Sequence, residues 1–342
     1  MILRQFAVGH SPMFQSNHPI QIISKFATAS GGTEQRAVRL GQILSKAGAR
    51  VKLWATHEPD PALLTMMPIT TIDLRQLRFP VFGTFIFVGC YLHIGRWIRL
   101  AHPSRRVIIF NTKNPEELER MAKQIAGANG LDACELVYSD ESLRTLIGRP
   151  GPVHQSPIDL ERFKPAKRPV SSTAPFTVGR LSRDYGYKFH ENDPELFKRL
   201  ASENVLIRLM GGTCLAEQLQ GISGIKLLGE GSEPANEFLN SLDCFLYRTS
   251  ANWFETYGRV VFEAMACGLP VVVGADGGYA QYVEHGVNGF IFHNNSDAER
   301  YVLELRDNTE LRMKIQASAR ASVVKMYSDD FETQVFQFYA RA

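Results

Sequence analysis

Two glutamates, Glu255 and Glu263, stand out in the stretch WFETYGRVVFEAMACGLPVVV at residues 253–273. The segment around Glu263 is otherwise apolar, which is typical of a helix buried on every side, and Gly268 is expected to end that helix. An ionised carboxylate there costs on the order of several kcal/mol unless a hydrogen-bonding group satisfies it. That group is either a local arginine or backbone N–H, or a ligand.

The start of the same helix is a candidate anion site. Gly258 is expected to begin the helix, which leaves free backbone N–H groups at its positive end. These groups belong to Thr256, Tyr257, Gly258 and Arg259. With a phosphate bound there, Glu263 would lie one turn deeper and could accept two hydrogen bonds from the vicinal hydroxyls of a ribose. Glu255, just outside the helix, would face whatever is attached to the phosphates.

Glycines at two other turns could also admit a nucleotide. Gly31 and Gly32 precede a predicted helix at Thr33, so a sugar phosphate could approach the backbone at a helix N-terminus. Taken alone, SGG is an ordinary loop, and it has neither the GxGxxG nor the GxxxxGK[ST] spacing of a dinucleotide site or a P-loop. Gly211 and Gly212 close the predicted strand LIRLMGG, where the nucleotide base would pass.

Alternating strands and helices must position these residues. Strands are predicted at VKLWA, FPVFGTFIFVGCYLHIG, RRVIIFN, FTVGRL, VLIRLMGG, IKLLGEG, DCFLYRTS, PVVVGAD and GFIFH. Helices are predicted at GGTEQRAVRLGQILSKAG, NPEELERMAKQIAGANG, EPANEFLNSL, GYAQYVEHG and SDDFETQVFQFYARA. The pattern predicts two doubly wound α/β domains with parallel sheets. Ligands bind beyond the carboxyl ends of such strands, so we expect the site in a cleft between the domains.

Length and composition fit this organisation. A chain of 342 residues exceeds one ordinary core, and the linker candidate is KPAKRPVSSTAP at 164–175. Residues 1–165 hold 20 Lys and Arg against 13 Asp and Glu, a net +7, whereas residues 166–342 hold 18 against 22, a net −4. The basic half weakly favours an anionic partner or a membrane surface, and no basic run with interleaved aromatics suggests nucleic acid.

Targeting and redox signals favour a reduced, cytosolic setting. The five cysteines show no CxxC spacing. The start MILRQFAVGHSPMFQ lacks the apolar core of a signal peptide. The apolar run at 79–95 is shorter than the roughly 18 residues expected of a membrane span, and we expect it to be a buried strand.

The stretch FETYGRVVFEAMACGLPVVVGADGGYAQYVEHGVNGF resembles the signature of the GT4-type retaining glycosyltransferases of the GT-B fold, the group 1 glycosyltransferases. That signature reads E-x-F/Y-G-x-x-x-x-E-A-M-A-x-G-x-P-V-V, followed by a glycine pair and V-x-x-G-x-N-G-F. SGGTEQRAVRLGQILSKAGARVKLWA, SPIDLERFKP and VGRLSRDYGYK extend the resemblance over most of the chain. It implies two Rossmann-like domains facing a cleft: 1–165 on the acceptor side, 166–325 binding the nucleotide sugar, and a C-terminal helix, 326–342, packing back on the first domain.

The resemblance also implies roles for single residues. Glu263 would hold the donor ribose, and Glu255 would lie near the transferred sugar. Arg180 and Lys188 would neutralise the diphosphate and stabilise its departure. The family's lysine usually follows that arginine more closely, so Arg183 competes with Lys188 for this role.

A second departure from the family concerns a histidine. The family often places one after a first-domain strand, near the reacting sugar, and the corresponding position in VIIFNTKNP is Asn111. Asparagine can hydrogen-bond a hydroxyl but cannot take its proton at neutral pH. Either that histidine is dispensable here or His93 in CYLHIG serves instead, although a histidine so placed is more often a core or strand-end residue.

Two further expectations concern metals and membranes. No Cys or His pair has ligand spacing and no DxD motif occurs, so neither a metal nor another cofactor is expected. The stretch HIGRWIRLAHPSRR at 93–106 is expected to be an amphipathic helix with a solvated face. It could also touch a membrane or a lipid-linked acceptor through Arg96, Arg99, Arg105 and Arg106.

Together these features predict a cytoplasmic, metal-independent retaining hexosyltransferase, peripheral at the inner membrane face if the basic stretch binds lipid. It would move a hexosyl group from a UDP-, GDP- or ADP-sugar to a glycan or lipid-linked glycan, as in polysaccharide biosynthesis. Two alternatives stay open. One is a glycoside hydrolase with Glu255 and Glu263 as acid and nucleophile, and the other is a non-catalytic nucleotide-sugar-binding protein, which Asn111 motivates.

Overall fold

The computed structural model describes residues 18–166 and 175–341, which form two compact units. The first unit contains the described residues up to Phe110, together with Asn114–Val137 and the chain from Asp329 onward. The second contains Asn111–Lys113 and the described part of Tyr138–Ser328. The N-terminal stretch judged for a signal peptide and most of the predicted linker lie outside the described residues.

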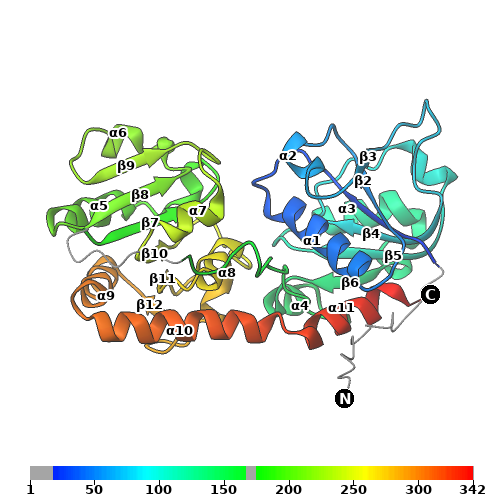
Figure 1. The fold of residues 1–342 in the computed structure, drawn as a ribbon. Coiled ribbons are helices and arrows are strands. Elements are labelled where there is room, and N and C mark those ends of the chain that lie inside the picture. The colour runs from blue at the N-terminus through cyan, green and yellow to red at the C-terminus, as the bar shows by residue number, and fades with distance from the viewer. Residues whose placement is uncertain (1–17, 167–174, 342) are drawn as a thin grey trace, which may run out of the picture. The chain divides into compact units, whose positions relative to one another are not determined.

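The first unit is built on a six-stranded parallel sheet with the order β3-β2-β1-β4-β5-β6 (Figure 1). Its strands are β1 (Ile20–Ser24), β2 (Val51–Ala55), β3 (Ile69–Thr71), β4 (Phe82–Val88), β5 (His102–Phe110) and β6 (Glu135–Tyr138). Its helices are α1 (Gly32–Lys46), α2 (Pro61–Leu64), η1 (Arg96–Leu100), α3 (Pro115–Ala126), η2 (Gly127–Ala133) and α11 (Asp329–Ala340). Helix α11 packs beside α1, and Phe336 shares a core with Ile22 and Val38.

The second unit has its own six-stranded parallel sheet, with the order β12-β11-β10-β7-β8-β9. Its strands are β7 (Thr177–Leu181), β8 (Leu206–Met210), β9 (Ile225–Leu228), β10 (Cys244–Tyr247), β11 (Val271–Gly274) and β12 (Phe290–Phe292). Its helices are α4 (Glu141–Ile147), η3 (Gly186–Lys188), α5 (Asp193–Ser202), η4 (Thr213–Leu215), α6 (Ala216–Leu219), α7 (Ala235–Asn240), α8 (Arg259–Ala266), η5 (Gly278–Tyr282), α9 (Asn295–Asp307) and α10 (Thr309–Met326).

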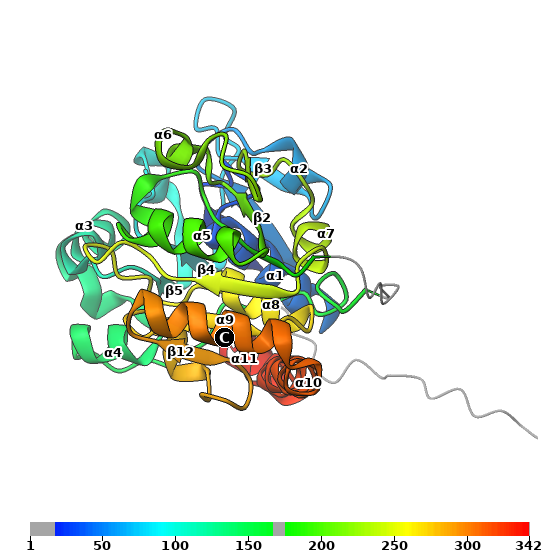
Figure 2. The same cartoon turned by 90° about the vertical axis from the view of Figure 1, so that its left-hand side faces the viewer.

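The two faces of the second sheet carry different helices (Figure 2). Helices α5 and α9 share a core with Leu246 and Val272, which point to one face. Helix α8 packs on β10 and β11 with side chains outside that core, so it covers the opposite face. The sheet is therefore buried on both sides, as its β-branched strand β11 predicts.

Both sheets have the same topology. Counted from the first strand of each unit, both run in the order 3-2-1-4-5-6, that of a dinucleotide-binding Rossmann fold. The order reverses between β1 and β4 in the first unit and between β7 and β10 in the second. Ligands of such sheets bind outside the carboxyl ends of the strands at that reversal. The segments that follow β7 and β10 are therefore where a site is expected.

Two predicted helices are wrong. Over 93–106 the chain forms only the short 3-10 helix η1 and then enters β5, because Gly95 adopts φ 75° and the strand pairs Phe82 with His102. Arg105 is buried and ion-paired with Glu135, so it offers nothing to a lipid. The segment GYAQYVEHG forms the 3-10 turn η5 instead of an α-helix. In the described residues no helix is both long enough and apolar enough to cross a bilayer.

Candidate functional site

Helix α8 holds Glu263 where the sequence predicts it, inside an apolar helix and only 7% exposed. Its Oε1 accepts a hydrogen bond from Arg259 Nε at 2.8 Å. Among the described residues no hydrogen bond reaches Oε2. Burial raises the pKa of Glu263, and Arg259 opposes that rise. One carboxylate oxygen is thus fixed by the protein, and the other remains as an acceptor for a ligand.

The side chain of Arg259 is anchored on both sides. Besides Glu263, it donates from Nη1 to Ser156 Oγ at 2.9 Å and to the Pro157 carbonyl at 2.6 Å. From the sequence, only the backbone N–H of Arg259 is predicted to contact the donor. Its i,i+4 spacing to Glu263 is the signal that identifies the ion pair.

The turn that begins α8 is shaped by a glycine. Gly258 is the N-cap residue with φ 66°, and a Cβ there would lie 2.5 Å from Cδ1 of Tyr279. In the same loop, Gly278 N donates to the Glu255 carbonyl at 2.8 Å. A Cβ on Gly278 would lie 1.9 Å from the Thr256 carbonyl oxygen. Gly258 and Gly278 therefore let the loop 276–278 pack closely against residues 255–258.

In that turn, the side chains of Thr256 and Tyr257 bond to other protein groups. Tyr257 is 5% exposed, stacks on Phe262 with ring centroids 4.4 Å apart, and shares a hydrogen bond with the Tyr327 hydroxyl. Burial raises the pKa of Tyr257 well above its ordinary value. Thr256 Oγ1 donates to the Asn111 carbonyl at 3.2 Å. Tyr257 and Thr256 can therefore offer a ligand mainly their backbone groups.

Lys188 and Glu255 meet at the carboxyl ends of β7 and β10. Lys188 Nζ lies 2.5 Å from Glu255 Oε2, and the two side chains are 10% and 20% exposed. The Tyr247 hydroxyl donates to the same carboxylate oxygen at 3.5 Å. Burial, and next the charge of Glu255, raises the pKa of Tyr247 well above its ordinary value. A nearly buried ion pair at this edge supplies both a cation and an anion for a polar ligand.

Arg180 lies beneath this pair and not at the surface. It is 1% exposed and donates to the Lys188 carbonyl at 2.5 Å and to the Arg248 carbonyl at 2.7 Å. Its Nη1 also lies 3.4 Å from Asp193, which accepts from Arg248 Nε at 2.6 Å. In this arrangement Arg180 holds the backbone of Lys188, and a direct contact with a diphosphate requires these bonds to rearrange. Its catalytic role stays a prediction.

Arg183 and Gly211 occupy the neighbouring loops. Arg183 is half-buried and donates to the Tyr187 hydroxyl at 3.2 Å. Gly211 has φ 77°, and a Cβ there would lie 1.9 Å from the Ser182 carbonyl oxygen. Glycine is therefore needed at 211 to let the loop after β7 pass over the end of β8.

Gly31 and Gly32 lie in the first unit, at the start of α1. Gly31 is the N-cap residue, and a Cβ there would lie 2.1 Å from Oε2 of Glu34, which is buried. Around Gly32 the space is open within 4 Å. His93 is exposed in the segment after β4 of the same unit. Of the twelve predicted site residues, the structure thus places these two glycines in one unit and the other ten in the second.

The structure adds residues that the sequence analysis missed. Asp193 and Arg248 form a buried layer under Lys188, and Tyr247 contacts Glu255. Asp193 begins helix α5, Tyr247 ends strand β10 and Arg248 follows it, so 55 residues separate Asp193 from Arg248. No local spacing links them, so only the folded sheet could reveal them.

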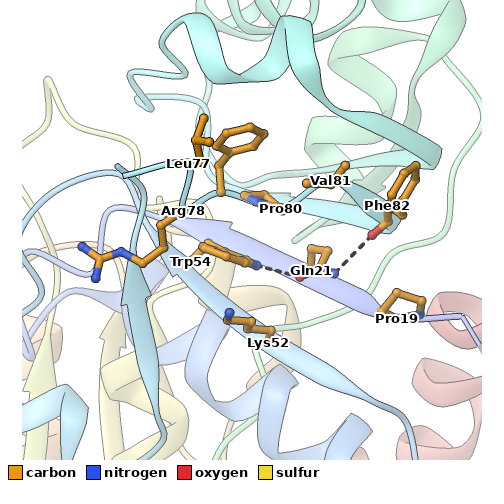
Figure 3. Close-up of a pocket in the computed structure, with 10 residues that line it drawn as sticks. Pro19, Gln21, Lys52, Trp54, Leu77, Arg78, Pro80, Val81 and Phe82 are labelled. Atoms are coloured by element: carbon orange, nitrogen blue, oxygen red, sulfur yellow. Dashed lines mark hydrogen bonds between the residues drawn. The ribbon is translucent and has the colours of Figure 1, made fainter. Parts of the chain in front are cut away.

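A cavity of about 480 Å³ lies elsewhere, in the first unit (Figure 3). It is lined by Gln21, Lys52 and Trp54 on the sheet and by residues 77–82. None of the twelve predicted site residues lines it.

Comparisons with known proteins agree with the strand order and the motif. Residues 162–322 match the family model of the glycosyl transferases group 1. The D-inositol 3-phosphate glycosyltransferase of Geodermatophilus obscurus is 26% identical over 246 residues, 64% of this chain and 51% of that protein. The alpha-monoglucosyldiacylglycerol synthase of Acholeplasma laidlawii is 29% identical over 103 residues, 27% of this chain and 26% of that protein. The matched segments thus span about half or less of these relatives.

The fold is shared over the whole length of a solved structure. The Anabaena protein HepE in complex with UDP and glucose superposes with a TM-score of 0.72 at 16% identity, covering 95% of this chain and 98% of that one. At this identity the likeness concerns the fold. Over residues 162–322, just under half of its length, the chain therefore matches the group 1 glycosyl transferases, and its two units have the GT-B fold.

Proposed function

We propose that the protein transfers a hexosyl group from a nucleotide-diphosphate sugar to a glycan or lipid-linked glycan, with retention of configuration and without a metal. The observation that carries this proposal is the pair Glu255 and Glu263 at the start of α8, one beside Lys188 and the other with one oxygen still open. The family match and the UDP complex of HepE support a nucleotide-sugar donor.

The donor nucleotide would be held at the start of α8. Vicinal ribose hydroxyls would donate to Oε2 of Glu263, while Arg259 keeps Oε1 and the side-chain rotamer in place. The phosphates would lie at the backbone N–H groups that precede and begin the helix. These contacts use one charged side chain and the helix terminus.

Lys188 would stabilise the charge that develops on the departing diphosphate. Its ammonium group is already fixed by Glu255, and its backbone is fixed by Arg180, so little reorganisation would be needed during the reaction. Arg183, half-buried on the same loop, would supply a second positive charge. Metal independence is part of the proposal because these cations can do the electrostatic work that a divalent ion does elsewhere.

The acceptor is the least constrained part of the proposal. The two relatives named above carry the names of a monoglucosyldiacylglycerol synthase and a D-inositol 3-phosphate glycosyltransferase, which differ in their acceptors. A glycan or lipid-linked glycan acceptor would fit the match of residues 162–322 to a sugar-transferring family. Because Asn111 cannot take a proton at neutral pH, another group would remove the acceptor's proton.

A hydrolase fits the site less well. It needs one carboxylic acid that is protonated and one carboxylate open to the same sugar. Here Glu255 is paired with Lys188 and the buried Glu263 with Arg259, so the protein already engages one oxygen of each carboxylate. A non-catalytic binding protein remains the second candidate because Asn111 stands at the family's histidine position.

Calorimetric titration with UDP, GDP and ADP tests the proposal directly. Glu263→Gln removes a charge-assisted hydrogen bond worth about 1.5–3 kcal/mol, so nucleotide affinity should fall roughly 10- to 100-fold. Glu299→Gln, on the distant face of α9, is the matched control and should bind as the wild type does. Equal affinity of Glu263→Gln and wild type would refute the ribose role.

Donor consumption separates the two candidates. Melting temperatures measured with UDP-, GDP- and ADP-sugars should identify the donor, because a ligand that binds only the folded state stabilises it by mass action. Release of the nucleoside diphosphate with a panel of acceptors is then expected for a transferase. Tight donor binding without release across the panel would favour the binding protein.

A further inference from the structure

A basic and apolar surface of the first unit takes no part in the proposed reaction. Three large apolar side chains are exposed there, Leu77 by 75%, Phe82 by 63% and Leu100 by 51%. Arg75, Arg78 and Arg99 are exposed on the same two segments of the chain. These six residues are called the basic apolar face below. Residues 74–115 contain no Asp or Glu, so the stretch that supplies the face has positive charges only.

Ring contacts join the two segments that supply this face. Phe79 lies 6.4 Å from Trp97 between ring centroids, and Phe82 stacks on His102 at 6.1 Å. The His102 N–H also donates to the Val81 carbonyl at 2.7 Å. The segment 74–82 and the segment that contains η1 are therefore in direct contact.

The turn is rigid and presents Leu77 outward. Asp73 and Arg78 exchange two backbone hydrogen bonds of 2.8 Å, and Asp73 Oδ1 accepts from the backbone N–H of Arg75 and Gln76. Leu77 has φ 52°, a conformation that strains a residue with a Cβ and suits glycine. Because its side chain is three-quarters exposed, packing within the unit does not offset this strain. A role outside the folded unit explains a leucine here.

The cavity behind the turn has mainly apolar walls (Figure 3). Its buried polar groups already bond each other: Trp54 Nε1 donates to Gln21 Oε1 at 2.6 Å, and Gln21 Nε2 donates to the Phe82 carbonyl at 3.1 Å. Lys52 lies over the Trp54 ring at 4.1 Å and is exposed at the same surface. A hydrocarbon chain with an anionic head suits such a space better than a polar ligand does.

We propose that the basic apolar face docks on an anionic lipid bilayer. Leu77 and Phe82 enter the boundary between headgroups and acyl chains, and the arginines contact anionic headgroups. Exposed apolar side chains surrounded by charges of one sign match a surface that is itself apolar and anionic. This face replaces the helix predicted at 93–106, and it does not depend on the proposed reaction.

Co-sedimentation of the full chain with lipid vesicles tests this proposal. We expect binding to vesicles that contain phosphatidylglycerol, weak binding to pure phosphatidylcholine, and loss of binding at high salt. Arg75→Gln/Arg78→Gln should lower the partition coefficient about 30-fold, or roughly fivefold for each arginine. The control Arg144→Gln/Arg300→Gln changes the net charge equally in the second unit and should bind as the wild type does.

Leu77→Gly is the sharpest variant. Glycine relieves the strained turn, so the melting temperature should stay the same or rise, whereas the partition coefficient should fall about tenfold with the loss of the inserted side chain. Met313→Ser, which removes a side chain exposed by 63% in the second unit, is its control. Unchanged vesicle binding of Leu77→Gly, or absence of wild-type binding to the anionic vesicles at low salt, would overturn the proposal.

Discussion

The two units share a strand order but differ in how the carboxyl ends of their strands are fixed. In the second unit, Lys188 pairs with Glu255, and Arg180 lies below them against Asp193. In the first unit, the turn after β1 is held by side chains that bind its main chain: Asp60 Oδ2 accepts from the Ala29 N–H at 2.8 Å, and Gln35 Nε2 donates to the Ala29 carbonyl at 2.7 Å, with open space at Gly32. The same topology thus supports one strand edge held by ion pairs between side chains and another held by hydrogen bonds from side chains to the main chain.

The difference shows that the strand order predicts where a site lies but does not determine which side chains are there. Strand reversal predicts where ligands bind in both units. At the strand edge of the second unit, Lys188 and Arg180 are fixed by protein partners before any ligand arrives, which is the arrangement that electrostatic catalysis requires. The family match, at 162–322, falls within that unit apart from the residues that the structure does not describe.

The largest expected effect comes from removing the buried acid of the second unit. Asp193→Ala leaves Arg180 and Arg248 without their carboxylate, and the free energy of unfolding should fall by about 3–5 kcal/mol. Glu135→Ala in the first unit is the comparison, because Arg105 there keeps three main-chain carbonyl acceptors. Urea denaturation measures both. Equal losses of unfolding free energy would show that the two carboxylates stabilise their units to the same degree.

Lys188→Ala tests whether the charged strand edge serves catalysis. Loss of the ammonium group should lower kcat about 10²- to 10³-fold, since a fixed positive charge at the leaving group is removed. Arg183→Ala should cost less, because Arg183 contacts the tyrosines Tyr185 and Tyr187 instead of a carboxylate and is more exposed than Lys188. Steady-state kinetics with the identified donor measures kcat of both variants. A larger effect of Arg183→Ala would assign it the leading role.

Two glycine substitutions compare the turns themselves. Gly211→Ala brings a Cβ against the Ser182 carbonyl at a positive φ, so stability should fall by about 2 kcal/mol or more. Gly32→Ala meets open space in the first turn of a helix, and stability should change by less than about 0.5 kcal/mol. Thermal unfolding measures both. Loss of donor affinity in a stable Gly32→Ala protein would extend the donor site to the first unit.

The smallest effect is a pH dependence at Glu263. Burial raises its folded pKa above the unfolded value of about 4.3, so the folded state holds this proton more tightly. The contribution of Glu263 to stability is therefore present at low pH and is lost as pH rises through the folded pKa. The stability of Glu263→Gln relative to wild type should increase from pH 4 to pH 7. A constant difference would mean that Arg259 fully compensates the burial.

Much of the fold could be predicted from local patterns. The β-branched run of β11, the amphipathic α1 and the glycine that ends α8 lie where periodicity and turn chemistry place them. The strand β1 was not predicted, because IQIIS is short and has polar residues within a buried strand. A helix was predicted at 93–106 because the charged residues there have helical spacing. In the structure, residues from His102 onward pair with β4 instead, and such tertiary contacts override local preference.

The candidate site was predictable only in part. Glu263 could be found because an acid in an apolar helix needs a partner, and Arg259 follows from i,i+4 spacing. Lys188 was assigned through the family resemblance, but its pairing with Glu255, 67 residues away, depends on the meeting of β7 and β10. Arg180 shows the limit most clearly, since its burial under the loop cannot be read from a strand-end position.

Helix α11 has a consequence for the order in which the chain folds. Val335, Phe336 and Tyr339 complete the core around β1 and α1, although more than 280 residues separate them in sequence. During synthesis on the ribosome, the second unit has emerged before this last helix appears. The first unit therefore completes its core only after the second unit has been synthesised, and until then its exposed β-sheet core is open to aggregation.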